Sequence, residues 1–588
     1  MNQTFHTPTR WDLKSLYPNE SGQMLPNEVK EITELIHTLK EETDFILQCE
    51  QFINESMLQT LSNVQSRLKK AEYYCYCLAS EIEDHSSLDA LRGKINTLKN
   101  AAQALFLKWQ QYIINLPTDK REEWYSFPFV KAFLNEFSKN NFDSFNNETV
   151  NHTKNELHHW QSMYTQLIRT LEIELADENT SKYISFSEAT HIAMNHDNPT
   201  KRTKAFNALT NKLHTEKDSF ANALNNIAQL RIKQSDALQQ EDILADSLST
   251  NGISKKALFT MWQTIDDNLN RFTSFLDSQK KDGEELTWHE LMTSKQHSQE
   301  KIPFSKAVED ICNSLRAIND EMAQFILHAI NNGWVDAEQR HNKPIQGFCA
   351  PFFQEGESRI SLQYDGTIES ARILAHELGH AWHFKQLEDN AALSSSATSF
   401  PMSLAECASI LFEVNFINHL LTVTDDLHTK KALLHYKIKS SLNYVMSIRG
   451  AFIFEQRFYE KSKDRQLTST EIEELSIQSQ KVAYNNHLKQ YQPFVWIKYG
   501  QFYEPNIPFY NYPYTFGYLL SIGLLTIAKQ EGCNFHKKYK QFLSETRKKP
   551  VEELVYEHFR IDLCSPAFWQ QAVNQIVTDM EEYAELQK

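Results

Sequence analysis

Glycine is scarce in this chain of 588 residues, at only 14 positions. Few positions can therefore adopt a positive φ angle without strain, which argues against folds built from many tight hairpins. Glu, Lys, Gln and Leu, which favour helices, are frequent instead. The length exceeds what one compact core usually holds. We therefore expect a mainly helical protein that divides into two or more lobes.

Long apolar stretches are also missing. The longest apolar run, at 516–528, is interrupted by Gly and Ser, and it is shorter than the about 20 residues that a membrane-spanning helix needs. The first 18 residues contain no basic segment followed by an apolar one, so no secretory signal is apparent. These features predict a cytoplasmic protein that makes no contact with a membrane.

Excess positive charge and paired cysteines are absent as well. The formal net charge is −16, which argues against a nucleic-acid partner. The eight cysteines are scattered along the chain, and Cys75 and Cys77 do not form a C-x-x-C pair. Neither a thiolate metal site nor a redox dithiol is therefore expected. Thiols that stay reduced in a cytoplasm are the simplest interpretation.

Apolar residues recur at helical spacing through most of the chain. In 201–232 they follow steps of three and four residues, as on one buried face of a long helix. Similar patterns predict helices over 27–80, 88–115, 152–178, 305–332, 428–462 and 469–492. The polar segment 195–205 joins two helical regions. We therefore predict an N-terminal helical lobe over 1–200 and a second unit over 201–588.

One region departs from the helical pattern. Segment 345–367 contains a short apolar run and a turn-like QEGE, after which Ile360, Leu362 and Tyr364 alternate with polar residues. Period-two alternation bounded by glycines predicts two short strands. A helix is then expected to begin near Thr367.

That helix contains His376, Glu377 and His380 in the order H-E-x-x-H. Residues four apart lie on one face of a helix, so both imidazoles can bind one cation. In sites of this kind the glutamate does not bind the zinc, but acts as the general base for the water that attacks a peptide. The motif therefore predicts one zinc site with Glu377 as the base and then the acid.

Two histidines bind zinc poorly alone, so a third protein ligand is required. The metzincin pattern is excluded, because His383 and Gln386 occupy the positions that it needs as Gly and His. Glu388 would lie about 12 Å beyond His380 along a continuing helix, which is too far. Glu406, which follows a non-helical break and opens an apolar helix, is the better candidate.

Other roles remain open for these residues. Ser403 and Glu406 also have the spacing of a capping box, in which Glu406 would bond the backbone of Ser403. Glu413, two turns later, is a second candidate ligand or a carboxylate that orients a histidine. His383 shares the face of the two ligand histidines, and we expect a structural or orienting role for it.

The chain resembles the oligoendopeptidase F family of zinc metallopeptidases, which are gluzincins related to thimet oligopeptidase. The resemblance covers most of the sequence and rests on four segments in order: RWDLKSLYP (10–18), GESRISLQYDGTIESARILAHELGHAWH (356–383), SLAECASILFE (403–413) and PFYNYPYTFGYLLS (508–521). It implies that His376, His380 and Glu406 hold one Zn²⁺ per chain. It also implies a mainly helical fold with two lobes around a deep substrate channel, a small sheet beside the H-E-x-x-H helix, and a zincin-like catalytic domain over 201–588.

The C-terminal tyrosines have two interpretations. Their alternation over 510–518 suits a half-buried strand, although Pro513 and Gly517 interrupt it. The resemblance instead assigns to Tyr510, Tyr514 or Tyr518, and to Tyr514 first, a hydrogen bond to the oxyanion of the reaction. The chain departs from the family at Gln501, because relatives often carry a histidine there that could titrate.

The sequence thus predicts a cytoplasmic zinc metalloendopeptidase that hydrolyses short unstructured peptides, in an oligomeric state that it leaves undefined. An exposed strand edge within 345–364 could bind the peptide as an added strand. One alternative is a carboxypeptidase or dipeptidase, which needs a cation to bind the free carboxylate of the substrate. Arg359 is a candidate for that cation, although a structural salt bridge is the more common role for such a residue. Another is a helical peptide-binding protein without catalytic activity.

Overall fold

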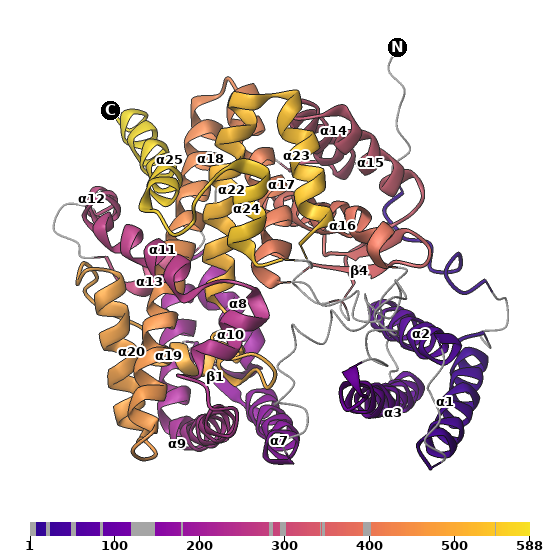
Figure 1. Cartoon of the computed structure of the whole chain (residues 1–588). Coiled ribbons are helices and arrows are strands. Elements are labelled where there is room, and N and C mark those ends of the chain that lie inside the picture. The colour runs from indigo at the N-terminus through magenta and orange to yellow at the C-terminus, as the bar shows by residue number, and fades with distance from the viewer. Residues whose placement is uncertain are drawn as a thin grey trace.

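The computed structural model describes residues 8–18, 24–48, 55–82, 86–118, 148–177, 180–280, 286–293, 301–340, 343, 347–391, 401–546 and 549–588. Within these ranges the protein is mainly helical, and one small sheet lies beside helix α16 (Ile368–Ala391) (Figure 1). The predicted fold class is therefore confirmed, including the position of the sheet next to the H-E-x-x-H helix.

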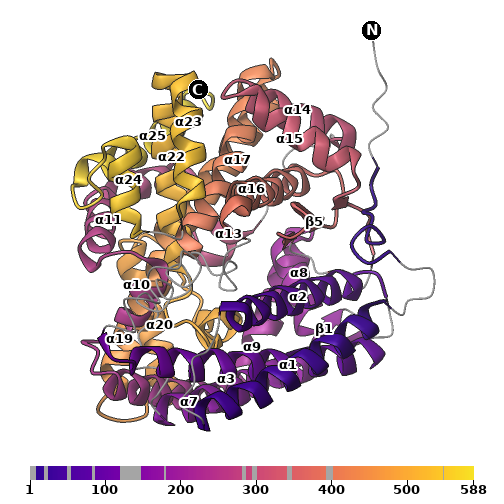
Figure 2. The same cartoon turned by 45° about the vertical axis from the view of Figure 1, so that its right-hand side comes forward.

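The N-terminal helices form a layer with a core of its own. These helices are α1 (Met24–Gln48), α2 (Glu55–Ala79) and α3 (Ser86–Ile114). Their core also includes Ala350 and Phe352 of strand β4 (Phe348–Phe352), so the layer packs directly on the sheet. Figure 2 shows α2 below α16 on this side of the molecule.

Most buried apolar residues from Leu157 onward belong to a second, larger core, with Ala350 and Phe352 of β4 in the N-terminal one. The division of the chain at residue 200 stays a prediction. The helical elements of this part are α7 (Glu148–Thr170), α8 (Phe186–Asn195), α9 (Pro199–Ala237), α10 (Leu244–Asn251), α11 (Lys255–Asp267), α12 (Leu269–Ser278), α13 (Trp288–Met292), α14 (Phe304–Arg316), α15 (Asp320–Asn331), α16, α17 (Met402–Val423), α18 (Leu427–Leu442), the π-helix η1 (Asn443–Ser447), α19 (Ile448–Ser462), α20 (Ser469–Ala483), α21 (Val495–Lys498), the 3₁₀-helix η2 (Gly500–Tyr503), α22 (Tyr512–Glu531), α23 (Cys533–Ser544), α24 (Val551–Phe559) and α25 (Pro566–Glu585).

The two strands predicted before the motif helix are present as β4 and β5 (Glu357–Ser361), which pair antiparallel. The short β3 (Val335–Asp336) pairs parallel with the other side of β5, so the order is β3-β5-β4 and β4 lies at an edge. Gly366, at φ +80°, allows the turn into α16. The Thr367 hydroxyl then accepts a hydrogen bond from the Ser370 N–H at 3.2 Å, which caps the first turn.

Most predicted helical segments are confirmed, with three corrections. Helix α20 ends at Ala483, so the predicted segment 469–492 is not helical over 484–492. Helix α7 ends at Thr170, and the rest of the predicted segment 152–178 forms β1 (Glu172–Asp177), which pairs with β2 (Thr180–Ser185). The strand interpretation of the tyrosine segment is also wrong from residue 512 onward, because α22 begins there with Pro513 in its first turn. In the β1 segment and in the tyrosine segment, tertiary packing decided between a helical and a strand periodicity that are nearly equal in the sequence.

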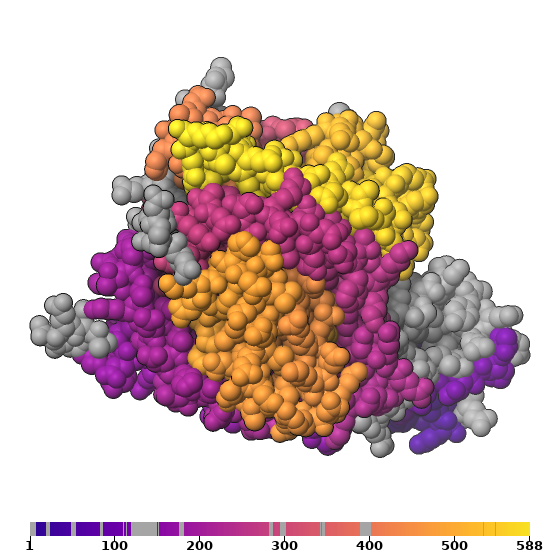
Figure 3. Space-filling view, turned by 90° about the vertical axis from the view of Figure 1, so that its left-hand side faces the viewer, coloured from indigo at the N-terminus to yellow at the C-terminus, as the bar shows by residue number. Residues whose placement is uncertain are grey.

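Segments far apart in the chain meet in the second core. Helices α19 and α20 pack against α9, more than 200 residues earlier, and Figure 3 shows their orange surface bordered by magenta. Among the described residues, α17 is the one helix that is long and apolar enough to cross a membrane. However, 72% of its most apolar window is buried, as in the core helix of a folded protein.

Helices α16 and α17 lie in close contact because a glycine stands between them. A Cβ atom added at Gly379 would lie 2.7 Å from the Cα of Ser409 and 2.9 Å from the carbonyl oxygen of Ala408. Real Cβ atoms do not approach a backbone this closely, so any larger residue must push the two helices apart.

We predict that Gly379→Ala lowers the free energy of unfolding by about 1–3 kcal/mol, the usual cost of overpacking a core. Gly93→Ala is the matched control, because Gly93 lies in α3 and a Cβ there meets nothing within 4 Å. The control should be neutral or stabilising, since alanine favours a helix more than glycine does. Denaturant unfolding measures both variants, and equal stabilities would contradict the close contact.

Candidate metal centre

The H-E-x-x-H residues and the predicted third ligand converge in the structure. Helix α16 carries His376 and His380, and α17 carries Glu406. One donor atom from each of the three lies within 4.8 Å of the others. The His376 Nε2 atom is 3.4 Å from Glu406 Oε2, and the two imidazole ring centroids are 4.9 Å apart. Two imidazoles and a carboxylate, drawn together in this way, are a donor set that fits zinc.

Burial sets the charge states of this cluster. Burial lowers the pKa of His380 well below its ordinary value, and the neighbouring His376 lowers it further. His380 is therefore neutral and has a lone pair for a cation. Burial also opposes protonation of His376, but hydrogen bonding to Glu413 and its charge, with those of Glu406 and Glu377, raise the pKa to about 9. A metal ion must displace that proton.

The carboxylate of Glu413 orients His376 from behind. Its Oε2 atom lies 2.8 Å from His376 Nδ1, so the Nε2 atom of the ring is left for the metal position. The same Glu413 oxygen accepts a hydrogen bond from Arg372, which also binds Glu369. Of the two roles open for Glu413, the structure supports the orienting one.

Glu406 is held in place from its own helix. Its Oε2 atom accepts a hydrogen bond from the Ser409 hydroxyl at 3.2 Å, and its side chain is buried. The capping-box alternative is not seen, because Ser403 lies inside α17 and bonds to Asn251. Burial raises the pKa of Glu406.

Glu377 lies beside these donors without belonging to the group of three. Burial raises its pKa to about 7, against the lowering effect of His376. The backbone of Gly347 packs closely against it: a Cβ at residue 347 would lie 2.9 Å from Glu377 Oε1, so a side chain there would displace the carboxylate. A carboxylate with this pKa can accept and return a proton near neutral pH.

The three predicted tyrosines lie in different surroundings. Tyr510 and Tyr514 are hydrogen-bonded to each other, and both are partly exposed. Burial raises the pKa of Tyr514 far above its usual range, and Glu406 and Glu377 add to the rise, so its hydroxyl is protonated and near the cluster. Tyr518 is buried, and its hydroxyl lies 2.5 Å from that of Ser441. The structure thus favours Tyr510 and Tyr514.

The loop that carries Tyr510 is held at both ends. Arg231 of α9 donates a hydrogen bond to the carbonyl oxygen of Glu504. Glu455 of α19 accepts one from the Phe509 N–H at 3.0 Å. Phe509 itself has φ +54°, a left-handed conformation that is strained for a phenylalanine. These contacts fix the backbone next to Tyr510.

Three further side chains that the sequence singled out have clear positions in the structure. His383 points away from the metal cluster, with its Nε2 atom 3.0 Å from the Thr546 hydroxyl, so its role is structural. Arg359 has the structural salt bridge that the sequence favoured and not a substrate contact, because it is fully buried, pairs with Glu357 at 2.8 Å and bonds to the Asp12 carbonyl and the Ser15 hydroxyl. Gln501 is exposed on η2.

Three further residues near the cluster carry no signal in the sequence. Arg372 supports Glu413 from one turn before the motif. Tyr444, on the π-helix η1, stacks on Tyr518 and is close enough to Glu413 and Glu406 for their charges to raise its pKa, which burial already raises. Burial raises the pKa of Tyr76 of α2, and the charge of Glu377 adds to the rise, so Tyr76 also lies near the cluster. Only an alignment of relatives or a structure could have singled them out.

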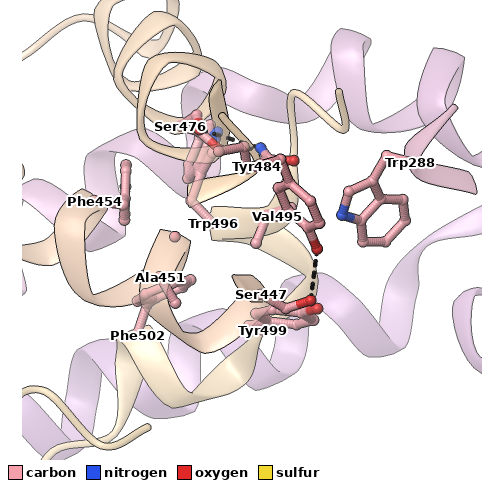
Figure 4. Close-up of a pocket in the computed structure, with 12 residues that line it drawn as sticks. Trp288, Ser447, Ala451, Phe454, Ser476, Tyr484, Val495, Trp496, Tyr499 and Phe502 are labelled. Carbon is pink, nitrogen blue, oxygen red and sulfur yellow. Dashed lines mark hydrogen bonds between the residues drawn. The ribbon is translucent and has the colours of Figure 1, made fainter. Parts of the chain in front are cut away.

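A separate cavity lies between α13, α19, α20 and α21 (Figure 4). Trp288, Tyr484 and Tyr499 line it, and the hydroxyls of Ser447 and Tyr484 bond across one wall at 2.7 Å. Its volume of about 10 Å³ is room for about one water molecule. None of the metal-centre residues lines this cavity, so it is not the site.

A mainly helical fold in which an H-E-x-x-H helix meets a carboxylate of the next helix defines a metallopeptidase. The comparisons with known proteins agree. The model of peptidase family M3 matches residues 192–575, and the chain therefore belongs to peptidase family M3.

Among curated relatives, the chain is 22% identical over 330 residues to the chromosomal oligoendopeptidase F of Lactococcus lactis subsp. cremoris. That match covers 55% of this chain and 54% of the relative, so it spans about half the length of each. Two solved structures share the fold over nearly the whole chain. A peptidase from Chlamydophila abortus has a TM-score of 0.79 at 17% identity, covering 98% of each chain. Oligoendopeptidase-F from Enterococcus faecium has a TM-score of 0.70 at 15% identity, covering 96% of this chain and 99% of its own.

We predict that Glu413→Gln weakens zinc binding by about 10- to 100-fold, the usual loss when the partner of a ligand histidine is changed. The amide keeps the size of the carboxylate but removes the charge that orients and polarises His376. Competition with a chelator of known affinity measures the change. Glu474→Gln, at an exposed carboxylate of α20, is the control. An affinity equal to that of the control would show that Glu413 does not support the ligand.

Proposed function

We propose that this protein is a zinc metalloendopeptidase that hydrolyses internal bonds of short, unstructured peptides. The observation that carries the proposal is the convergence of His376, His380 and Glu406, with Glu377 beside them. The three would hold one Zn²⁺. Zinc bound there would supply a Lewis acid that polarises a peptide carbonyl and lowers the pKa of water.

Glu377 would carry the proton through the reaction. With its pKa raised to about 7, the carboxylate accepts a proton from the attacking water and then returns it to the leaving amine. Because Gly347 has no side chain, the start of strand β4 can lie against this carboxylate without displacing it. The atoms balance: one water is consumed, and a carboxylate and an amine are released.

Tyr514 and Tyr510 would stabilise the oxygen that becomes negative during the attack. Their hydroxyls are protonated at neutral pH. Because one of them donates to the other, the pair would offer one hydrogen bond to this oxygen, and the bond between the two tyrosines would support the donor. The buried contacts of Glu504 and Phe509 keep the loop in place, so little reorganisation is needed. Tyr518 would support this region indirectly through its stacking on Tyr444.

Strand β4 offers a way to hold any peptide sequence. It is the edge of its sheet, and no strand among the described residues pairs with its outer side. An extended peptide could add to that edge through main-chain hydrogen bonds, which do not depend on its side chains. Only unfolded substrates can adopt this conformation, in agreement with a cytoplasmic enzyme of peptide degradation that acts within a channel between the lobes.

We predict that Glu377→Gln lowers kcat by about 10²- to 10⁴-fold, the usual contribution of a general base, while one zinc per chain is retained. The amide cannot accept the proton, but it is not among the ligands. Metal analysis together with a quenched-peptide assay measures both quantities. A wild type without zinc would refute the metal centre, and full activity in the variant would refute the assigned base.

We also predict that peptides blocked at both ends are cleaved at rates similar to those of free peptides. Arg359 is fully buried and therefore cannot bind a terminal carboxylate. Mass spectrometry of the products distinguishes internal cleavage from stepwise release of terminal residues. Activity that requires a free C-terminus would favour the carboxypeptidase alternative.

A further inference from the structure

The N-terminal layer contributes an aromatic corner beside strand β4, formed by Trp11, Tyr76 and Phe348. The ring centroid of Phe348, the first residue of β4, lies 4.5 Å from that of Tyr76 and 6.1 Å from that of Trp11. Trp11 is buried, and its Nε1–H donates a hydrogen bond to Glu81 at 2.9 Å. Tyr76 is 45% exposed, unusual for a large ring in a core contact. The ring of Trp11 is therefore buried and held in place, and the ring of Tyr76 is accessible to a ligand.

The corner lies next to the proposed catalytic base. Phe348 follows Gly347, where an added Cβ would lie 2.9 Å from Glu377 Oε1 and 2.7 Å from the Cγ2 atom of Ile373. Burial is the main reason that the pKa of Tyr76 is raised, and the charge of Glu377 contributes. The hydroxyl of Tyr76 and the carboxylate of Glu377 are therefore within electrostatic range, although they come from opposite sides of the sheet.

The side chains of β4 point alternately toward the aromatic corner and toward Glu377. Phe348, Ala350 and Phe352 contact the N-terminal core, on the α2 side. Cys349 points the other way, toward α16, and its thiol is near Glu377. A peptide that pairs with the free edge of β4 must alternate in the same two directions. Every second side chain then faces the aromatic corner, and cross-strand neighbours have Cβ atoms about 5 Å apart.

We propose that this aromatic corner is a substrate subsite, which receives a large apolar or aromatic side chain close to the scissile bond. The proposal rests on the proposed function and deepens it, because it names the class of peptide that is preferred. The exposed ring of Tyr76 and the partly buried ring of Phe348 offer an apolar surface with one hydroxyl, and the buried Trp11 supports Phe348 from behind. A charged side chain would lose hydration on this surface without gaining a partner. The main chain binds to β4 without regard to sequence, and the corner adds selectivity at one position.

The test compares peptides that carry Phe, Leu, Ala, Asp or Lys at one position at a time around a single scissile bond, with both ends blocked. The ratio of kcat/KM for Phe over Ala is measured for the wild type, Tyr76→Ala and Tyr76→Phe. We expect a ratio of about 10 or more at one position of the wild type, as apolar pockets commonly give. It should fall below about 3 in Tyr76→Ala and persist in Tyr76→Phe.

A ratio is used because a general loss of activity does not change it. Tyr183→Ala, at an exposed tyrosine of β2 far from the site in the sequence, should keep the ratio of the wild type. An unchanged ratio in Tyr76→Ala, or no preference at any position in the wild type, would overturn the subsite. If the zinc-loaded wild type cleaves no peptide, the proposed function fails, and the Kd values of the same peptides decide about the subsite. Equal Kd values for the Phe and Ala peptides would overturn it, and a Phe preference that Tyr76→Ala removes would support it.

Discussion

The contact between α16 and α17 at Gly379 is the constraint on which the metal centre depends. The missing side chain lets the backbone at Ser409 approach the face of α16 that carries both histidines. Glu406 and Glu413 then reach that face from α17, one to the metal position and one to the back of His376. A wider separation of the helices would remove both carboxylates together. A residue with no chemistry of its own therefore determines the site.

Close packing has an electrostatic consequence, because it buries several ionisable groups in one place. Two histidines and three glutamates lie close together, and such a cluster is costly unless each member has a partner. The structure supplies such partners to the glutamates, and some of these partners have further partners of their own. Arg372 neutralises Glu413 and Glu369, Tyr436 donates to Glu369, and Ser409 donates to Glu406. What remains is a site whose charge a divalent cation would balance.

The sequence could predict the parts that local spacing determines. The helix with His376 and His380 and the strands before it follow from periodicity and motif. Spacing made Glu406 only one candidate for the third ligand, and the family resemblance selected it. Partners that arrive from distant segments could not be predicted. A salt bridge was the favoured role for Arg359, but its bonds to Asp12 and Ser15 of the N-terminal segment could not be foreseen. Tyr76 lies 300 residues before Glu377, and no pattern in a single chain connects the two.

The most direct measurement for this account is anomalous diffraction at the zinc absorption edge from crystals of the zinc-loaded protein. The account predicts a single strong peak between His376, His380 and Glu406, with Glu377 outside the ligand set and Glu413 still bound to His376. A peak at other residues, or no peak from protein that has been shown to contain zinc, would contradict it.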